Sequence, residues 1–325
     1  MRAICLEEKS IQYVDDHQPP IVRENEVIVD VIVAGICETD LQLAQGYMGF
    51  SGILGHEFVG IATSGAYEGA RVVGEINCNC RKCPRCESGM GNHCEYRTVV
   101  GINRHDGAFA DQVAIPQTSL HLIPDSVSDD QAVLIEPLAA ALEIGQQMDL
   151  SAVNNAIVLG DGRLANLSAQ VISQHVPHLK VVGKHDLKLN RFRRLGIETI
   201  QLEQLVCEKV FDLVVDCTGS ISGLPIALQL VKPRGTVVMK TTVATDHQLS
   251  LAPIVIDEIN VLGSRCGPFG LAIQMLEADR FDLSGLITHR FPLEAADQAF
   301  QTAVDPTAFK VVFDVMNPKD IKKTH

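Results

Sequence analysis

The sequence lacks an excess of positive charge and any long apolar run. It has 27 Lys and Arg against 40 Asp and Glu among 325 residues, which gives a formal net charge of −13. A chain this acidic, with no basic stripe, matches a phosphate backbone poorly, so nucleic-acid binding is not expected. No stretch approaches the roughly 20 apolar residues that span a bilayer, so no membrane partner is expected either.

The N-terminus also lacks the pattern of a secretory signal. It reads MRAICLEEKSIQYVDD, without a cationic segment followed by an apolar run. We therefore expect a cytoplasmic protein. In such a reducing compartment the ten cysteines are not expected to form a disulfide framework. Four of them lie at tight, regular spacings, which points instead to a metal.

The first part of the chain has the pattern of an all-β domain. Short alternating runs such as 26–33 (EVIVDVIV) predict strands over residues 1–150, and residues 129–148 predict a helix that leads out of the domain. The run 310–315 (KVVFDV) is again strand-like. We therefore expect residues 289–325 to return to the first domain and complete it.

The second part, residues 151–288, alternates between strand and helix patterns. Strands are expected at 156–160, 179–183, 211–216, 235–240 and 259–263, and helices at 163–175 and 186–195. Alternation of this kind predicts a parallel sheet with helices on both faces. Two domains also suit a chain of 325 residues, because a single hydrophobic core usually stops growing at a shorter length.

One cluster of cysteines has the spacing of a structural metal site. Its pattern is C-x2-C-x2-C-x7-C, formed by Cys80, Cys83, Cys86 and Cys94. Four thiolates can surround one tetrahedral zinc, which then has no position left for a substrate. The intervening residues are polar and rich in turns, so a metal is the natural means of ordering this segment.

A second set of candidate ligands is spread along the chain. Cys37 follows a predicted strand, in AGICETD, and His56 and Glu57 lie in GILGHEFVG, where glycines permit tight turns. Glu136 lies in the otherwise apolar LIEPLAAAL. Burial of a carboxylate without a partner is costly, so a cation beside Glu136 is expected.

Together these motifs resemble the medium-chain zinc-dependent alcohol dehydrogenase family, near its polyol and threonine dehydrogenase-like branches. The resemblance rests on GIC-x-TD, GHEFVG, the four-cysteine segment, EP and VLGDG, and it covers nearly the whole chain. It implies an α/β protein with a GroES-like β-barrel catalytic domain and a Rossmann domain with a doubly wound parallel sheet. It also implies hydride transfer between a small alcohol, aldehyde or ketone and NAD(P), and a homodimer or homotetramer.

The resemblance also assigns roles in a catalytic zinc site. It gives Cys37, His56 and Glu136 as the zinc ligands. Glu57 is either an exchanging fourth ligand or a carboxylate just outside the coordination sphere. Asp40 would fix the tautomer of His56, and Thr39 would bind the substrate hydroxyl and relay its proton. A zinc with three protein ligands keeps one position open and lowers the pKa of an oxygen bound there.

A glycine motif predicts the dinucleotide site. LGDGRLA follows a predicted strand and precedes a predicted helix, and it reads G-x-G-x-x-A with Gly160, Gly162 and Ala165. The first glycine makes the turn, and the second lets a pyrophosphate approach the helix N-terminus.

The tip of the next strand bears on the choice of cofactor. NAD-selective sites usually place an acid there, whereas this chain has Gly-Lys-His, and Asp186 is interpreted as a helix cap. Lys184 and His185 could meet a 2′-phosphate, which favours NADP(H) over NAD(H). The resemblance adds Thr218 and Arg265 as residues near the cofactor.

Two other functions fit parts of the pattern. A zinc-free reductase of the same fold would lack the dispersed metal ligands. A non-catalytic, zinc-stapled NADP-binding sensor or scaffold is the second alternative. It is left open because Glu38 follows Cys37 directly and because no His near Gln42 extends the proton relay.

Overall fold

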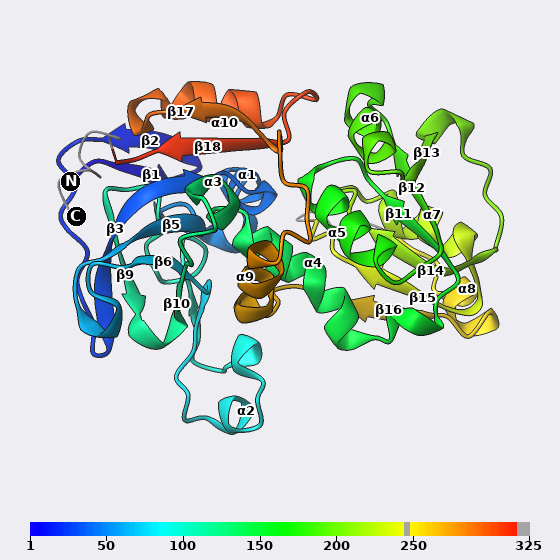
Figure 1. The fold of residues 1–325 in the computed structure, drawn as a ribbon, viewed down its shortest axis with the longest axis horizontal. Helices are drawn as coiled ribbons and strands as arrows, with labels where there is room; N and C mark the ends of the chain where they lie inside the picture. Colours follow the sequence, from blue (N-terminus) through cyan, green and yellow to red (C-terminus); the bar gives the residue numbers. More distant parts are fainter. Residues whose placement is uncertain (244–247, 317–325) are drawn as a thin grey trace. The chain divides into compact units, whose positions relative to one another are not determined.

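The computed structural model describes residues 1–243 and 248–316, and it divides into two compact units (Figure 1). Unit 1 comprises Met1–Glu136 and Phe269–His325, and unit 2 comprises Pro137–Pro268. The predicted polar end of the chain, 317–325, lies outside the described residues. Among the helices of the described part, none combines the length and the apolar character needed to cross a membrane.

Unit 1 is built on a seven-stranded and a three-stranded sheet. The larger sheet has the order β10-β6-β5-β3-β18-β17, with β9 also paired to β3, and the smaller has the order β2-β1-β4. The larger sheet contains β3 (Glu26–Gly35), β5 (Glu57–Ala62), β6 (Arg71–Gly74), β9 (Gln112–Pro116), β10 (Leu120–Leu122), β17 (Ile287–Phe291) and β18 (Lys310–Asp314). The smaller contains β1 (Ala3–Glu7), β2 (Ser10–Val14) and β4 (Gly52–Ile53).

The β-branched run predicted as a strand becomes β3, the central strand of this sheet. It pairs antiparallel with β18, with Val312 opposite Gly35, which brings the late strand into unit 1. Its side chains are largely buried, and both of its edges are paired with neighbouring strands. The aromatic rings of Phe109 and Phe313 pack edge to face, with centroids 5.0 Å apart, and stabilise the core beside it.

The remaining elements of unit 1 are short. They are α1 (Glu38–Ala44), α2 (Pro84–Glu87), α3 (Asp129–Ala132), α9 (Phe269–Glu277), α10 (Ala296–Ala303), β7 (Asn77–Cys78) and β8 (Thr98–Val99). The segment that carries α2, drawn in cyan, projects from the sheets of this unit (Figure 1).

Unit 2 contains one parallel sheet of six strands in the order β13-β12-β11-β14-β15-β16. The strands are β11 (Asn155–Leu159), β12 (His178–Gly183), β13 (Glu198–Gln201), β14 (Phe211–Asp216), β15 (Val231–Met239) and β16 (Asn260–Gly263). The helices are α4 (Ile135–Gln147), α5 (Arg163–Ser173), α6 (Asp186–Arg194), α7 (Gly223–Leu230) and α8 (Ala252–Ile256). This is the order of a doubly wound dinucleotide-binding fold, and the order reverses between β11 and β14.

Two expectations about the boundary between the units need correction. The helix predicted over 129–148 is two helices, because the ring of Pro137 excludes the carbonyl of Val133 from a continuous helix. Unit 2 also begins and ends earlier than the predicted 151–288. The reason is that α4 packs within unit 2: a Cβ on Gly267 would lie only 1.8 Å from the Ala139 carbonyl oxygen.

Candidate active site

Three of the predicted catalytic ligands come together in unit 1. One ligand atom each from Cys37, His56 and Glu57 lies within 4.8 Å of the others. His56 and Glu57 are buried, and Glu57 Oε1 has no hydrogen-bond partner among the described residues. An unpartnered buried carboxylate oxygen carries a desolvation cost that a bound cation removes. Sulfur, nitrogen and oxygen ligands in one group suit zinc.

Asp40 accepts hydrogen bonds from both of the loops that carry these ligands. Cys37 lies between β3 and α1 and is the N-cap of α1, whereas His56 lies between β4 and β5. The fully buried carboxylate of Asp40 accepts hydrogen bonds from the backbone N–H of Cys37 at 2.7 Å and of Gly55 at 3.3 Å. Asp40 Oδ1 also lies 3.4 Å from His56 Nδ1, an ion-pair distance without hydrogen-bond geometry. Asp40 therefore positions the backbone of both loops and faces the imidazole.

Lys310, which was not predicted from the sequence, supplies a positive charge beside Glu57. It lies at the start of β18, is fully buried, and pairs with Glu57 Oε2. Its Nζ also donates to the carbonyl oxygen of Ile36 at 3.0 Å. Gly35 makes room for it, because a Cβ there would lie 2.3 Å from Lys310 Cε. Burial lowers the pKa of Lys310 to about 8, although the negative charge of Cys37 opposes this shift.

We expect Lys310→Met to destabilise the protein by about 3–5 kcal/mol, because it leaves the Glu57 carboxylate buried without its cation. The measurement is urea unfolding of the protein after the chelator-accessible zinc has been removed, so that no metal replaces the lysine beside Glu57. Lys232→Met is the matched control, since Lys232 pairs with Asp212 at the surface and its loss should cost less than about 1 kcal/mol. Equal effects of the two substitutions would refute a special role for the buried pair.

The other predicted residues near this site are less closely grouped. Thr39 Oγ1 lies 3.8 Å from Cys37 Sγ, in the first turn of α1. Glu136 lies half-buried in the first turn of α4, outside the group of three ligand atoms, and its assignment as a ligand stays a prediction. Glu38 is exposed and accepts a hydrogen bond from Gln42 Nε2 at 3.0 Å within α1.

The four cysteines of the projecting segment form a second group. Ligand atoms of Cys80, Cys83, Cys86 and Cys94 all lie within 4.8 Å of one another. Neighbouring sulfurs are 3.5–3.8 Å apart. Four sulfurs bound at about 2.3 Å to a central tetrahedral zinc would be about 3.8 Å apart, so the arrangement fits that ion. Hydrogen bonds from backbone N–H groups lower the pKa of the Cys83 thiol to about 6, and the N–H of Cys86 has the largest effect.

The glycine motif occupies the turn between β11 and α5 in unit 2. Gly160 has a φ of +119°, and a Cβ there would lie 2.6 Å from the carbonyl oxygen of Cys217, so only glycine fits. Gly162 caps α5 without a side-chain hydrogen bond, and a Cβ there would meet no atom within 4 Å. Ala165 is fully buried in the first turns of the helix. The N-terminus of a helix beside open space suits a pyrophosphate.

The tip of β12 differs from the sequence-based expectation, because an acid does lie there. Asp161, the middle residue of the glycine motif, accepts hydrogen bonds from the backbone N–H groups of Lys184 and His185 at 2.7 and 2.8 Å. Its Oδ2 also lies 3.0 Å from His185 Nδ1. A Cβ on Gly183 would lie 2.5 Å from Asp161 Cβ, so the glycine at the tip admits this side chain.

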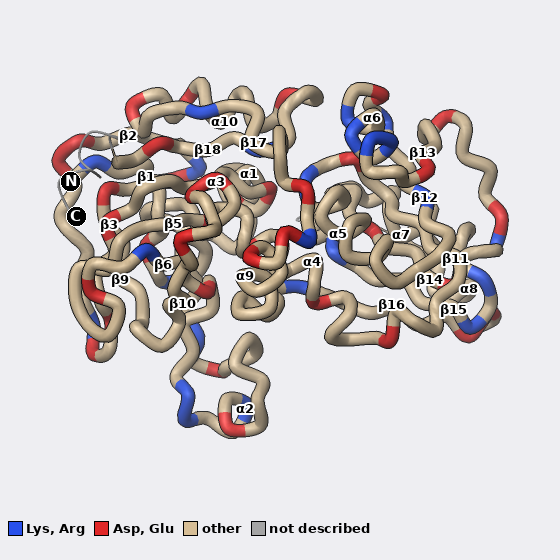
Figure 2. The backbone as a smooth tube through the Cα atoms, in the orientation of Figure 1, with Lys and Arg blue, Asp and Glu red and all other residues tan. Residues whose placement is uncertain are grey.

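The residues that follow the tip also differ from expectation. His185, not Asp186, is the N-cap of α6. Asp186 is the first helical residue, and it accepts a hydrogen bond from Arg193 at 2.8 Å. Figure 2 shows several Lys and Arg on α6. The side chain of Lys184 is exposed.

The remaining cofactor candidates follow other strands of the same sheet. Thr218 follows β14, and its hydroxyl donates to the fully buried Asp216 at 2.7 Å. Thr241, which follows β15, also donates to Asp216, at 3.1 Å. Arg265 follows β16 and is exposed. Because the strands are parallel, these residues and the glycine motif share one edge of the sheet, where such folds bind dinucleotides.

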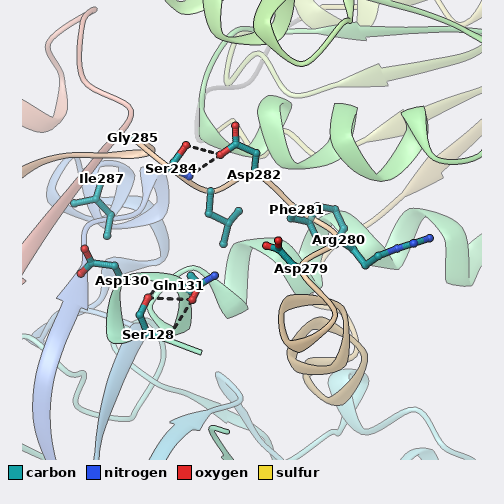
Figure 3. Close-up of a pocket in the computed structure, with 11 residues that line it drawn as sticks. Ser128, Asp130, Gln131, Asp279, Arg280, Phe281, Asp282, Ser284, Gly285 and Ile287 are labelled. Carbon is teal, nitrogen blue, oxygen red and sulfur yellow. Dashed lines mark hydrogen bonds between the residues drawn. The ribbon is translucent and has the colours of Figure 1, made fainter. Parts of the chain in front are cut away.

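Unit 1 also contains a cavity of about 580 Å³ (Figure 3). It is lined by α3 residues and by the segment 279–287, and it contains none of the predicted ligands. Two of its three carboxylates already have partners: Asp130 pairs with Arg290 at 2.6 Å, and Asp282 accepts from the hydroxyl and N–H of Ser284. We assign it no role in the reaction.

Known dehydrogenases are similar to this chain over most of its length. Residues 23–125 match the alcohol dehydrogenase GroES-like domain family. The chain is 27% identical to a sorbitol dehydrogenase of Halalkalibacterium halodurans, over 92% of this chain and 94% of that one. It is 26% identical to an L-threonine 3-dehydrogenase of a Marinomonas species, over 94% of this chain and 97% of that one.

Two solved structures share the whole fold. One is an alcohol dehydrogenase from E. coli CFT073 complexed with NADH, with a TM-score of 0.88, 24% identity, and coverage of 97% of this chain and 99% of that chain. The other is a zinc-binding dehydrogenase from Sinorhizobium meliloti bound to NADP. It has a TM-score of 0.86 and 24% identity, and the match covers 96% of this chain and 98% of that chain.

Proposed function

Because this chain belongs to the medium-chain zinc-dependent alcohol dehydrogenase family and is an NAD(P)-dependent alcohol oxidoreductase, we propose a catalytic zinc held by Cys37 and His56. Glu136 is proposed as the third ligand and Glu57 as an exchanging fourth ligand. The observation that carries the proposal is the buried group of Cys37, His56 and Glu57, in which Glu57 Oε1 lacks a partner.

When bound, zinc would act as a Lewis acid on the substrate oxygen, and the nicotinamide would accept or donate the hydride. The chain itself positions these groups. Asp40 holds the loops of Cys37 and His56 in register through their backbone N–H groups. Lys310 balances the charge of Glu57. We propose that the Thr39 hydroxyl accepts the proton of the substrate alcohol as it releases its own hydroxyl proton to solvent, to which it is partly exposed.

A second, structural zinc is proposed for the four cysteines of the projecting segment. Its four sulfur positions would all be filled, so it would order the segment and take no part in the reaction. The prediction of NADP(H) rested on Lys184 and His185 at a strand tip without an acid. Asp161 removes that premise, because its carboxylate lies at the tip.

The substrate class is proposed from the relatives. A sorbitol dehydrogenase and an L-threonine 3-dehydrogenase both carry small, polar alcohols in their names, so we propose a small polar alcohol for this chain. The experiment is a screen of polyols, hydroxy amino acids, simple alcohols, the matching carbonyl compounds, enones and quinones with both cofactors, in which nicotinamide absorbance is measured. Turnover only of enones or quinones, without zinc, would favour a zinc-free reductase. Nothing in the comparisons favours a non-catalytic sensor.

We also propose a homodimer or homotetramer. The strand β16 is at the edge of its sheet, and Val261 on it is 42% exposed. On α8, Val255 and Ile256 are exposed as well. An open edge bordered by apolar residues can pair with the same edge of a second copy about a two-fold axis. Light scattering should then give a multiple of 35.3 kDa. The cytoplasmic location stays a prediction.

A further inference from the structure

The acid at the tip of β12 comes from the glycine motif, and this placement bears on cofactor selectivity. Asp161 is nine-tenths buried, and its Oδ2 accepts the backbone N–H groups of Lys184 and His185 together with His185 Nδ1. Its other oxygen, Oδ1, accepts no hydrogen bond from the residues that the structure describes. One carboxylate oxygen is therefore anchored, and the other remains available at the edge of the sheet that binds dinucleotides.

We infer that Asp161 serves as the ribose-binding acid of this chain and makes it selective for NAD(H). In dinucleotide-binding folds an acid at this strand tip accepts hydrogen bonds from the hydroxyls of the adenosine ribose. Here residue 183 is glycine, and the space of its missing side chain is taken by Asp161. The acid is thus supplied by the first strand–helix turn. This inference rests on the proposed function, because it assumes that a nicotinamide dinucleotide occupies the site.

The contacts of Asp161 at the tip of β12 also disfavour the binding of a 2′-phosphate there. The two backbone N–H groups at the tip, which could otherwise bind a phosphate, already donate to Asp161. A phosphate placed there would also face the carboxylate at close range and with little water to screen the repulsion. The opposing attraction comes from the exposed Lys184, and an exposed ion pair contributes little. The buried anion therefore outweighs the surface cation.

The test is direct binding, which does not depend on turnover. NADH and NADPH are titrated by nucleotide fluorescence, and 5′-AMP and 2′,5′-ADP are used as competitors that differ only in the 2′-phosphate. We expect wild type to bind NADH and 5′-AMP at least about tenfold more tightly than their 2′-phosphorylated counterparts. Loss of a hydrogen bond to a charged group should make Asp161→Asn bind NADH about 10- to 100-fold more weakly, with the ratio to NADPH approaching one.

Asp186→Asn is the matched control, because Asp186 is an exposed acid beside the same tip that pairs with Arg193. It should leave the ratio unchanged. Tighter binding of NADPH and 2′,5′-ADP by wild type would overturn the inference, and this comparison decides it even when Asp161→Asn does not fold. If Asp161→Asn weakens the binding of NADH and NADPH equally, Asp161 stabilises the strand tip but does not select the cofactor. Failure of wild type to bind either dinucleotide would overturn the proposed function itself.

Discussion

Cys37→Ser should lower kcat/KM by at least about 1,000-fold while the protein stays folded, because it removes the only sulfur ligand of the proposed catalytic zinc. A serine hydroxyl does not ionise near neutral pH, so it replaces a thiolate ligand poorly. Cys37 lies between β3 and α1 and is only half-buried, so its loss opens little cavity. The measurements are steady-state kinetics, zinc content and Tm, and zinc content should fall from two to one per chain.

Cys207→Ser is the control for this variant. Cys207 is exposed and belongs to neither cysteine group, so its replacement should change neither zinc content nor turnover. A Cys37→Ser protein that retains full turnover would show that Cys37 does not hold the catalytic metal. An unfolded Cys37→Ser protein would assign the residue to folding instead.

Cys83→Ser should act mainly on stability. It breaks the group of four sulfurs, and binding of a structural zinc contributes directly to the folding free energy. We expect one zinc to be lost, Tm to fall by roughly 5–10 °C, and trypsin to cut faster after Arg81, Lys82 and Arg85 within the segment. The segment contains only short helices and a two-stranded ribbon, so little else orders it.

The same Cys207→Ser variant controls for the loss of a thiol. The outcome that would contradict a structural zinc is loss of turnover with unchanged Tm, zinc content and trypsin sensitivity. Such a result would place Cys83 in the reaction and would leave the segment ordered without a metal.

Features carried by short-range patterns could be predicted from the sequence. The run 26–33 became β3, and the glycine motif fell between β11 and α5, because side-chain alternation and turn residues act locally. The spacing of the four cysteines likewise anticipated their close approach. The prediction failed at the boundary between the units, since the packing of α4 within unit 2 depends on Gly267, more than a hundred residues away in the sequence.

Features that depend on distant residues could not be read from the sequence. Asp161 lies 23 residues from Lys184, and only the fold brings its carboxylate to that strand tip. Lys310 lies 253 residues from Glu57. One signal for Lys310 was available: a lysine that opens the apolar run KVVFDV must find a buried partner. Neither its partner nor the space beside Gly35 could be inferred from that signal.

The most direct test of the account is the zinc content of the purified protein, measured before and after brief exposure to a chelator. We expect two zinc ions per chain. One should be removed while the protein stays folded, with loss of alcohol oxidation that added zinc restores, and the other should leave only on unfolding. A single zinc per chain, lost only on unfolding, would contradict a catalytic zinc and would favour a non-catalytic dinucleotide-binding protein.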